Sequence, residues 1–300
     1  MSARGLIAGA LLVAAAGGLG AVSAATFAEN TSSAPPHPTA IHLRTKDPIL
    51  VGAGDIAFIP DGPRGEDERT AELIDAIVRQ NRGHVTVFAA GDDAYDVGSS
   101  SEFANEYAPT WGRFKAITRP APGNHEYVTP GAAGYFDYFH VRPYYAYDVG
   151  AWRIYSLNSE IDHERGSPQE RWLRRDLTRD PRKCVLAYWH RPRYSSGLHG
   201  SDSSLQPLWQ ALADHHADVV VTGHDHDYER FAPKQEIREF VVGTGGRSLY
   251  PFRLTTESGS QVRADAYGVI AFTLHRRSYD FQFIPAAGES FRDRGTFACR

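Results

Sequence analysis

Side chains able to bind metal ions follow short apolar runs at five places along the chain. Four of these places are "ILVGAGD", "VTVFAAGDDAY", "CVLAYWH" and "ADVVVTGHDH", and the fifth is "APGNHEY". In chain order they carry Asp55; Asp92 and Tyr95; Asn124 and His125; His190; and His224 and His226. Oxygen donors and imidazoles without a thiolate are typical of sites for iron, manganese or zinc.

The apolar runs predict buried strands, and the segments between them predict helices. "EDERTAELIDAIVRQN" places Leu73, Ile74 and Ile77 on one helical face, and "SPQERWLRRDL" opens with Ser167 and Glu170 in a capping box. This alternation indicates βαβ units, in which the carboxyl ends of neighbouring parallel strands share one edge of a sheet. Ligands of open α/β sheets bind along that edge, so we expect the polar residues to meet there.

Two segments depart from the alternation of strands and helices. "YYAYDVGAWRIYSLNSE" predicts a hairpin that turns at Gly150. After His226 the chain contains strand patterns alone, in "EFVVGTGG" and "YGVIAFTLHRRSYDFQFIP", and these predict a second, largely antiparallel sheet. "GTGG" lacks the Lys-Ser/Thr of a phosphate-binding loop, so we interpret it as a turn near the site.

The number of donors exceeds the need of a single ion. Seven residues are potential ligands: Asp55, Asp92, Tyr95, Asn124, His190, His224 and His226. Two ions that share a bridging carboxylate need about eight positions from protein, with water in the open ones. Seven residues with Asp92 counted twice supply that number, which predicts a binuclear site. Asp225 and Asp227 are expected to orient ligands or face solvent rather than bind metal.

The five motifs in this order resemble those of the calcineurin-like metallophosphoesterases, and within them those of the purple acid phosphatases. The series is "GD" (54–55), "GDDAY" (91–95), "GNHE" (123–126), "YWH" (188–190) and "GHDHDYER" (223–230). Tyr95 carries the finer resemblance, because other members have a histidine where this chain has Ala57 and lack the tyrosine. The resemblance implies an α/β fold of two packed mixed β-sheets flanked by helices, with the site at the carboxyl ends of the strands.

The resemblance also implies a role for each matching residue. The first ion, Fe(III), would be held by Asp55, Asp92, Tyr95 and His226. The second ion, a divalent Fe, Zn or Mn, would be held by Asp92, Asn124, His190 and His224, with Asp92 bridging. Outside the metal sites, His125 would contact the phosphate and His199 would face the leaving group.

These roles describe a hydrolysis of phosphate esters. Two cations neutralise charge on the phosphate and acidify the attacking water, the trivalent ion more strongly. One histidine then protonates the leaving oxygen, a contribution of about 10²- to 10⁴-fold. We favour His199 as this acid, and His125 is the alternative. The expected substrate is a small phosphate monoester.

Other functions fit the sequence less well. A phosphodiesterase or nucleotidase would use the same metal site, and it stays open as the second reading. A non-catalytic binding protein of this fold is a remote alternative, because none of the seven ligands is missing. A serine hydrolase would need Gly-x-Ser-x-Gly, which the chain lacks. The net charge of −4, without a Lys/Arg cluster, argues against nucleic acid as a structural partner.

The first 46 residues are expected to be separate from the catalytic domain, 47–300. Arg4, an apolar Ala/Gly/Leu-rich stretch and the small residues "VSA" predict a signal peptide over 1–24, and hence secretion. An uncleaved membrane anchor is the alternative, but the apolar stretch is short and glycine-rich. Residues 25–46 contain a Pro/Ser/Thr-rich stretch and predict a flexible linker. No membrane span is expected in the mature chain.

The chain has two cysteines, Cys184 and Cys299. An even number in a secreted chain favours a disulfide, which would tie the C-terminal tail to the start of a core strand. Two buried unpaired thiols are the alternative.

Overall fold

The computed structural model describes residues 43–57, 65–180, 182 and 184–300, which fall within one unit of the chain, Pro36–Arg300. The expected signal peptide and residues 25–42 of the expected linker lie outside the described residues and stay predictions. In the described part of the chain, no helix is both long enough and apolar enough to cross a membrane.

The first sheet has six strands in the order β13-β12-β11-β1-β2-β3. Their bounds are β1 Ile49–Ala53, β2 Val85–Ala90, β3 Thr118–Ala121, β11 Gly268–Leu274, β12 Ser278–Pro285 and β13 Arg294–Ala298. β1, β2 and β3 run parallel, and β11 pairs antiparallel with β1. Asp55, Asp92 and Asn124 therefore follow the carboxyl ends of three neighbouring parallel strands.

The second sheet has seven strands in the order β10-β8-β9-β7-β6-β5-β4. Their bounds are β4 Tyr145–Val149, β5 Trp152–Ser156, β6 Cys184–Tyr188, β7 Val219–Thr222, β8 Tyr228–Phe231, β9 Arg238–Val242 and β10 Ser260–Ala264. β5, β6, β7 and β9 run parallel. The hairpin of β4 and β5 turns at Gly150, which has a positive φ, as its sequence predicts. His190 follows β6, and His224 and His226 follow β7.

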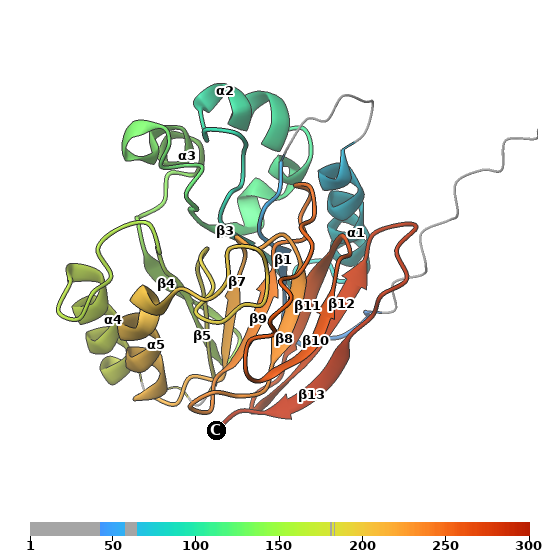
Figure 1. The fold of residues 1–300 in the computed structure, drawn as a ribbon. Coiled ribbons are helices and arrows are strands. Elements are labelled where there is room, and N and C mark those ends of the chain that lie inside the picture. Colours follow the sequence, from blue (N-terminus) through green and yellow to red (C-terminus); the bar gives the residue numbers. More distant parts are fainter. Residues whose placement is uncertain (1–42, 58–64, 181, 183) are drawn as a thin grey trace, which may run out of the picture. The chain divides into compact units, whose positions relative to one another are not determined.

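Helices connect the strands and cover the sheets. Their bounds are α1 Glu66–Gln80, α2 Ser100–Glu102, η1 Phe103–Tyr107, η2 Trp111–Ile117, η3 Pro130–Ala132, α3 Ala133–Phe139, α4 Pro168–Arg179, η4 Ser203–Leu205 and α5 Gln206–Ala213. In Figure 1, α4 and α5 lie beside the second sheet and α1 lies beside the first. The buried face of α1 contains Leu73, Ile74 and Ile77, as predicted.

The side chains of the second sheet alternate between two hydrophobic cores. On β6, Leu186 and Tyr188 belong to the large core that also contains β1, β2 and β11, whereas Val185 and Ala187 pack with α4 and α5. Because successive residues of a strand point to opposite faces, each buried strand must be apolar at every position. This explains why the runs in the sequence are continuous rather than alternating. The result is two packed mixed sheets flanked by helices, as the family resemblance implied.

The expectation of a separate antiparallel sheet after His226 is wrong. β9 pairs parallel with β7, and β11 pairs antiparallel with β1, so the C-terminal strands complete both sheets. The periodicity of the sequence predicts the strands correctly. It does not predict their order in the sheets, because that order depends on which apolar faces pack together in the folded chain.

The expected capping box of α4 is half formed. Ser167 is the N-cap, and its side chain accepts a hydrogen bond from the N–H of Glu170. The Glu170 carboxylate accepts from Gly166 and pairs with Arg174 instead of returning to the N-cap. The ion pair competes for the carboxylate that the motif needs.

Cys184 and Cys299 form a disulfide with 5.2 Å between their Cα atoms. The bridge joins the start of β6 in the second sheet to the residue after β13 in the first sheet. It spans a sequence separation of 115 residues, for which loop-closure entropy predicts a stabilisation of about 4–5 kcal/mol. The pairing confirms the prediction from the cysteine count.

Candidate metal centre

The structure brings all seven expected ligands together where the two sheets meet. The oxygen donors Asp55, Asp92, Tyr95 and Asn124 come from loops after β1, β2 and β3 of the first sheet. The imidazoles of His190, His224 and His226 come from loops after β6 and β7 of the second sheet. The main chain joins the two halves directly, because the N–H of His224 donates to Asp55 Oδ2 at 2.8 Å.

Four of these side chains form what we call the first donor group: Asp55, Asp92, Tyr95 and His226. The Tyr95 hydroxyl lies 2.9 Å from Asp55 Oδ1, 3.1 Å from Asp92 Oδ2 and 3.4 Å from His226 Nε2. His226 Nε2 lies 3.3 Å from Asp55 Oδ1. The Tyr95 hydroxyl therefore lies within 3.4 Å of one atom from each of the other three side chains.

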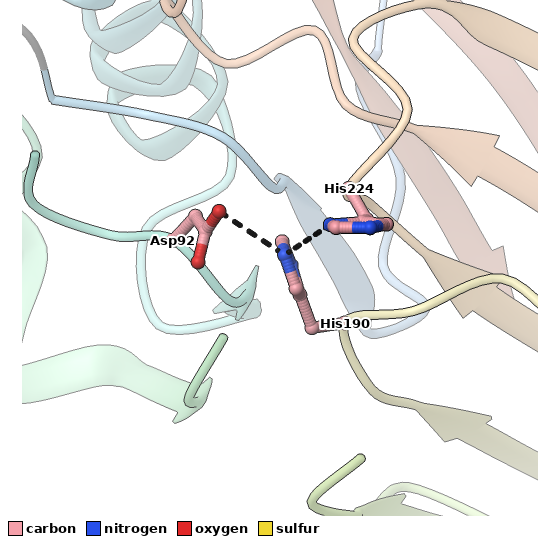
Figure 2. A group of neighbouring side chains, drawn as sticks. All are labelled: Asp92, His190 and His224. Carbon is pink, nitrogen blue, oxygen red and sulfur yellow. Dashed lines mark hydrogen bonds and ion pairs between the residues drawn. The ribbon is translucent and has the colours of Figure 1, made fainter. Parts of the chain in front are cut away.

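The second donor group consists of Asp92, Asn124, His190 and His224. His190 Nε2 lies 3.1 Å from Asp92 Oδ2, 3.2 Å from Asn124 Oδ1 and 3.2 Å from His224 Nδ1. Figure 2 shows Asp92 and His224 approaching His190 from two sides. Asp92 Oδ2 belongs to both donor groups, as the bridging ligand of a binuclear site must.

The hydrogen bonds of Nδ1 in His190 and His226 determine which tautomer each ring adopts. His190 Nδ1 lies 3.0 Å from the carbonyl of Ala90, and His226 Nδ1 lies 2.7 Å from the carbonyl of Ser248. A carbonyl only accepts, so each Nδ1 donates and each neutral ring keeps the Nε2 lone pair toward the donor group. This is the tautomer that a metal ligand requires, and these residues fit a metal in this respect.

Burial and charge at the donor groups also fit cations. Asp55 and Asp92 are buried, and the Asp92 charge raises the pKa of His190 to about 10 although burial alone would lower it. Burial and the charges of Asp55 and Asp92 hold the pKa of Tyr95 well above its usual value. Without a metal, a proton lies between His190 and Asp92, and another lies between Tyr95 and the carboxylates. A bound cation would replace these protons. A phenolate at Tyr95 needs a strongly positive neighbour.

Backbone geometry at the ligands is unusual and depends on small neighbours. Asp55, Asp92 and His224 all have positive φ, at 60°, 52° and 68°. Such conformations cost free energy in residues other than glycine and gather at functional sites. A Cβ added to Gly123 would lie 2.2 Å from Asp92 Oδ1, and one added to Gly223 would lie 2.5 Å from Asp55 Oδ2. These glycines let main chain pass directly against the carboxylates.

Glu126 is a positioning residue whose role the sequence alone does not predict. Its buried carboxylate accepts from the N–H groups of Asp92 at 2.9 Å, Asp93 at 2.8 Å, Ala94 at 3.2 Å and Gly123 at 2.7 Å. It therefore fastens the loop of Asp92 to the loop of Asn124. Its place in "GNHE" was the available signal, but a sequence does not show which N–H groups a carboxylate will meet.

The two expected catalytic histidines stand at different donor groups. His125 donates its main-chain N–H to Asp92 Oδ1 at 2.9 Å, and its ring lies 4.4 Å from that of Tyr95. The ring of His199 lies 4.3 Å from that of His224. Burial lowers the pKa of His199, and the charge of Asp225 opposes this. Both rings are partly open to solvent and adjoin the expected ligands.

The segment that follows "GTGG" packs against the first donor group, a role that the expected turn did not include. Arg247 donates its main-chain N–H to the carbonyl of Asp55 at 2.9 Å, and its guanidinium lies 4.9 Å from the Tyr95 ring centre. Tyr250 stacks on His226 with ring centres 4.1 Å apart. Asp93, next to Asp92, is buried, and its carboxylate has no hydrogen-bond partner among the described residues.

Comparisons with known proteins agree with this geometry. A model of the family described as calcineurin-like phosphoesterase matches residues 41–228. A barley nucleotide pyrophosphatase/phosphodiesterase is 27% identical in an alignment 287 positions long that covers 76% of this chain and 73% of the relative. Purple acid phosphatase 21 of Arabidopsis thaliana is 28% identical in an alignment 208 positions long that covers 59% of this chain and 45% of the relative.

Solved structures with the same fold include two phosphatases. Purple acid phosphatase PPD1 from yellow lupin superposes with a TM-score of 0.69 at 19% identity, covering 88% of this chain and 55% of that one. A dimetal phosphatase from Danio rerio superposes with a TM-score of 0.56 at 13% identity, covering 84% of this chain and 99% of that one. The chain thus spans about half the length of the lupin and Arabidopsis enzymes.

Gly123→Ala tests whether close approach of main chain holds Asp92 in place. The added methyl would overlap Asp92 Oδ1, so we expect the purified protein to lose most of its bound metal, measured by elemental analysis. Gly166→Ala is the control for a methyl group added without a clash: a Cβ there meets nothing within 4 Å, and Gly166, unlike Gly123, has a positive φ of 84°. The control should lose only about 1 kcal/mol of stability and keep its metal. Normal metal content in Gly123→Ala would contradict this account.

Proposed function

The chain belongs to the calcineurin-like phosphoesterase family, and on that premise we propose that it is a purple acid phosphatase-like enzyme that hydrolyses phosphate monoesters at two metal ions. One observation carries the proposal: Asp92 Oδ2 lies 3.1 Å both from the Tyr95 hydroxyl and from His190 Nε2. A carboxylate oxygen common to two donor groups suits a pair of cations that clamp one phosphate.

The proposed ligands divide as the two donor groups do. Asp55, Tyr95 and His226 would hold the first ion, Asn124, His190 and His224 would hold the second, and Asp92 would contribute to both. The tyrosine hydroxyl beside two carboxylates suits Fe(III) at the first position, since a trivalent ion best stabilises a phenolate. The imidazole and oxygen donors of the second group suit divalent Fe, Zn or Mn.

When bound, the metal pair supplies charge neutralisation and acidifies the attacking water. The remaining steps belong to side chains of this chain. His125 Nδ1 lies 2.5 Å from the carbonyl of Asp96, so Nε2 is left to face the phosphate. His199, beside His224, donates its proton to the leaving oxygen as the bond to phosphorus breaks. The substrate is a small phosphate ester.

A phosphodiesterase or nucleotidase is the second candidate. The observation in its favour is the barley relative named for nucleotide pyrophosphatase and phosphodiesterase activity, whose match spans 76% of this chain. Beside the second donor group, Arg191 Nη1 lies 3.3 Å from His224 Nε2, and Glu160 pairs with the same guanidinium at 3.0 Å. A guanidinium at this place could bind a further anionic group of a larger substrate.

We further propose that the protein is secreted. The disulfide between Cys184 and Cys299 supports this, because structural disulfides persist mainly in oxidising compartments. The expected signal peptide over 1–24 agrees with it.

Rates on matched esters distinguish the two candidate functions. The purified protein is assayed with an aryl phosphate monoester and with the corresponding diester, at acidic and neutral pH, with and without a chelator. We expect faster hydrolysis of the monoester and loss of both activities when the chelator removes the metals. A faster diester rate would favour the second candidate, and activity unaffected by prolonged chelation would contradict a metal-dependent reaction.

His226→Ala tests the assignment of the first ion. Removing one of four ligands should abolish the visible absorption of a tyrosinate–iron pair and lower the iron content, both measured on purified protein. His216→Ala, at an exposed histidine that precedes β7 and so lies at the opposite end of that strand from His224 and His226, should leave colour and iron unchanged. Retained colour in His226→Ala would show that the first ion lies elsewhere.

A further inference from the structure

Alternate side chains of the segment 223–230 contact two different partners. His224 and His226 belong to the donor groups, whereas Asp225 and Glu229 contact the loop Ser195–Ser201, here called the His199 loop. The "GHDHDYER" motif thus joins the ligands to the segment that carries His199. Asp225 was expected to orient ligands or face solvent; it is buried and contacts the His199 loop.

Asp225 is buried and accepts hydrogen bonds from three places in the His199 loop. Its Oδ1 accepts from the N–H of His199 at 2.6 Å, and its Oδ2 accepts from the N–H of Gly200 at 3.0 Å and from the Ser195 hydroxyl. Gly197 lies against the same carboxyl, since an added Cβ would be 2.4 Å from Asp225 Cγ. A buried carboxylate is costly unless such donors surround it, so the loop and the carboxylate hold each other.

Two further side chains fasten the same loop. Glu229 accepts from the N–H and the hydroxyl of Ser196, both at 2.6 Å. Arg253 donates to the carbonyl of Leu198 at 3.0 Å and to that of His199 at 2.8 Å. The main chain on both sides of His199 is therefore fixed from several directions.

The His199 side chain, in contrast, is held only by its neighbours' rings. Among the described residues its ring packs near His224 and Tyr250, with ring centres at 4.3 Å and 5.6 Å, and makes no hydrogen bond. The position of its imidazole is consequently set by its main chain. The shortest contact of that main chain is the hydrogen bond from its own N–H to Asp225.

We propose that Asp225 is a positioning residue that places His199 for proton transfer to the leaving group. The inference rests on the proposed phosphatase function. In the step concerned, the N–H bond of the His199 imidazolium breaks as the phosphorus–oxygen bond breaks, and the proton goes to the leaving oxygen. Asp225 takes no part in this transfer; among the described residues, the hydrogen bonds to its carboxylate all come from the His199 loop. A displacement of about 1 Å in such a group can cost about 100-fold in rate.

The test compares Asp225→Asn, His199→Ala and the double variant with the wild type, all loaded with metal. Asn has the same shape but replaces one acceptor oxygen with an NH₂ donor, so it cannot accept from both His199 and Gly200. Asp227→Asn is the matched control, because Asp227 is buried two residues further along and its carboxylate has no hydrogen-bond partner among the described residues. The probes are 4-nitrophenyl phosphate, with a good leaving group, and an alkyl phosphate, with a poor one.

The inference predicts a dependence on the leaving group. Asp225→Asn should lose about 10- to 100-fold in kcat on the alkyl phosphate and less than about 3-fold on 4-nitrophenyl phosphate, as His199→Ala should. The double variant should be no slower than His199→Ala alone, and Asp227→Asn should resemble the wild type. Metal content should be unchanged in Asp225→Asn.

Three results would overturn the inference. The first is equal slowing of both substrates in Asp225→Asn, and the second is a double variant whose loss is the product of the two single losses. The third is loss of metal in Asp225→Asn with an unchanged leaving-group dependence. Each would show that Asp225 does not act through His199. Failure of the proposed function is a different result, since the wild type would then hydrolyse neither substrate. Amide hydrogen exchange of the peptide 195–202 still decides in that case: about 10-fold faster exchange in Asp225→Asn, but not in Asp227→Asn, supports the anchor.

Discussion

Two buried carboxylates at the meeting point of the two sheets constrain the whole site. Asp55 and Asp92 are buried, and in the described part of the chain their ion-pair partners are histidines alone. A buried charge needs compensation, and imidazoles, a tyrosine hydroxyl and main-chain N–H groups provide part of it here. Metal cations would provide the rest. The need to compensate these charges agrees with two features of the site. Loops from both sheets converge on the carboxylates, and the backbone is strained at Asp55, Asp92 and His224.

The loops that carry the ligands are held by a repeated device, a buried carboxylate that accepts several main-chain N–H groups. Glu126 does this for the loops of Asp92 and Asn124, and Asp225 for the loop of His199. Glu239 accepts from the N–H groups of Arg193 at 2.9 Å and Tyr194 at 3.0 Å, close after His190. Loops outside sheets lack ladder partners, and a carboxylate can satisfy several donors at once. The site therefore gains rigidity without added secondary structure.

The convergence of the seven side chains was predictable from the sequence because most of the signals are local. Most of these residues stand shortly after a glycine, as Asp92 does in "GDDAY" and His224 in "GHDHDYER", and His190 directly follows an apolar run. The capping residue Ser167 and the turn at Gly150 were predictable for the same reason. The parallel pairing of β1 with β2 and of β6 with β7 also agrees with the helix that connects each pair.

What could not be predicted depends on contacts between distant segments. The C-terminal strands were assigned to a sheet of their own, although β9 and β11 insert into the two existing sheets. The roles of Glu126 and Asp225 depend on which main-chain groups come to lie within 3 Å of them in the folded chain. Both residues are acids beside ligands, and in the sequence alone they do not differ from a solvated acid such as Asp96.

The central claim is that one oxygen of Asp92 serves two metal ions. The most direct test is a crystal structure of the metal-loaded protein, with anomalous scattering recorded at the iron, zinc and manganese edges. The account predicts two ions per chain, both bound to Asp92 Oδ2, with Tyr95 on the ion that also binds Asp55 and His226. A single ion, or two ions of which only one contacts Asp92, would contradict it.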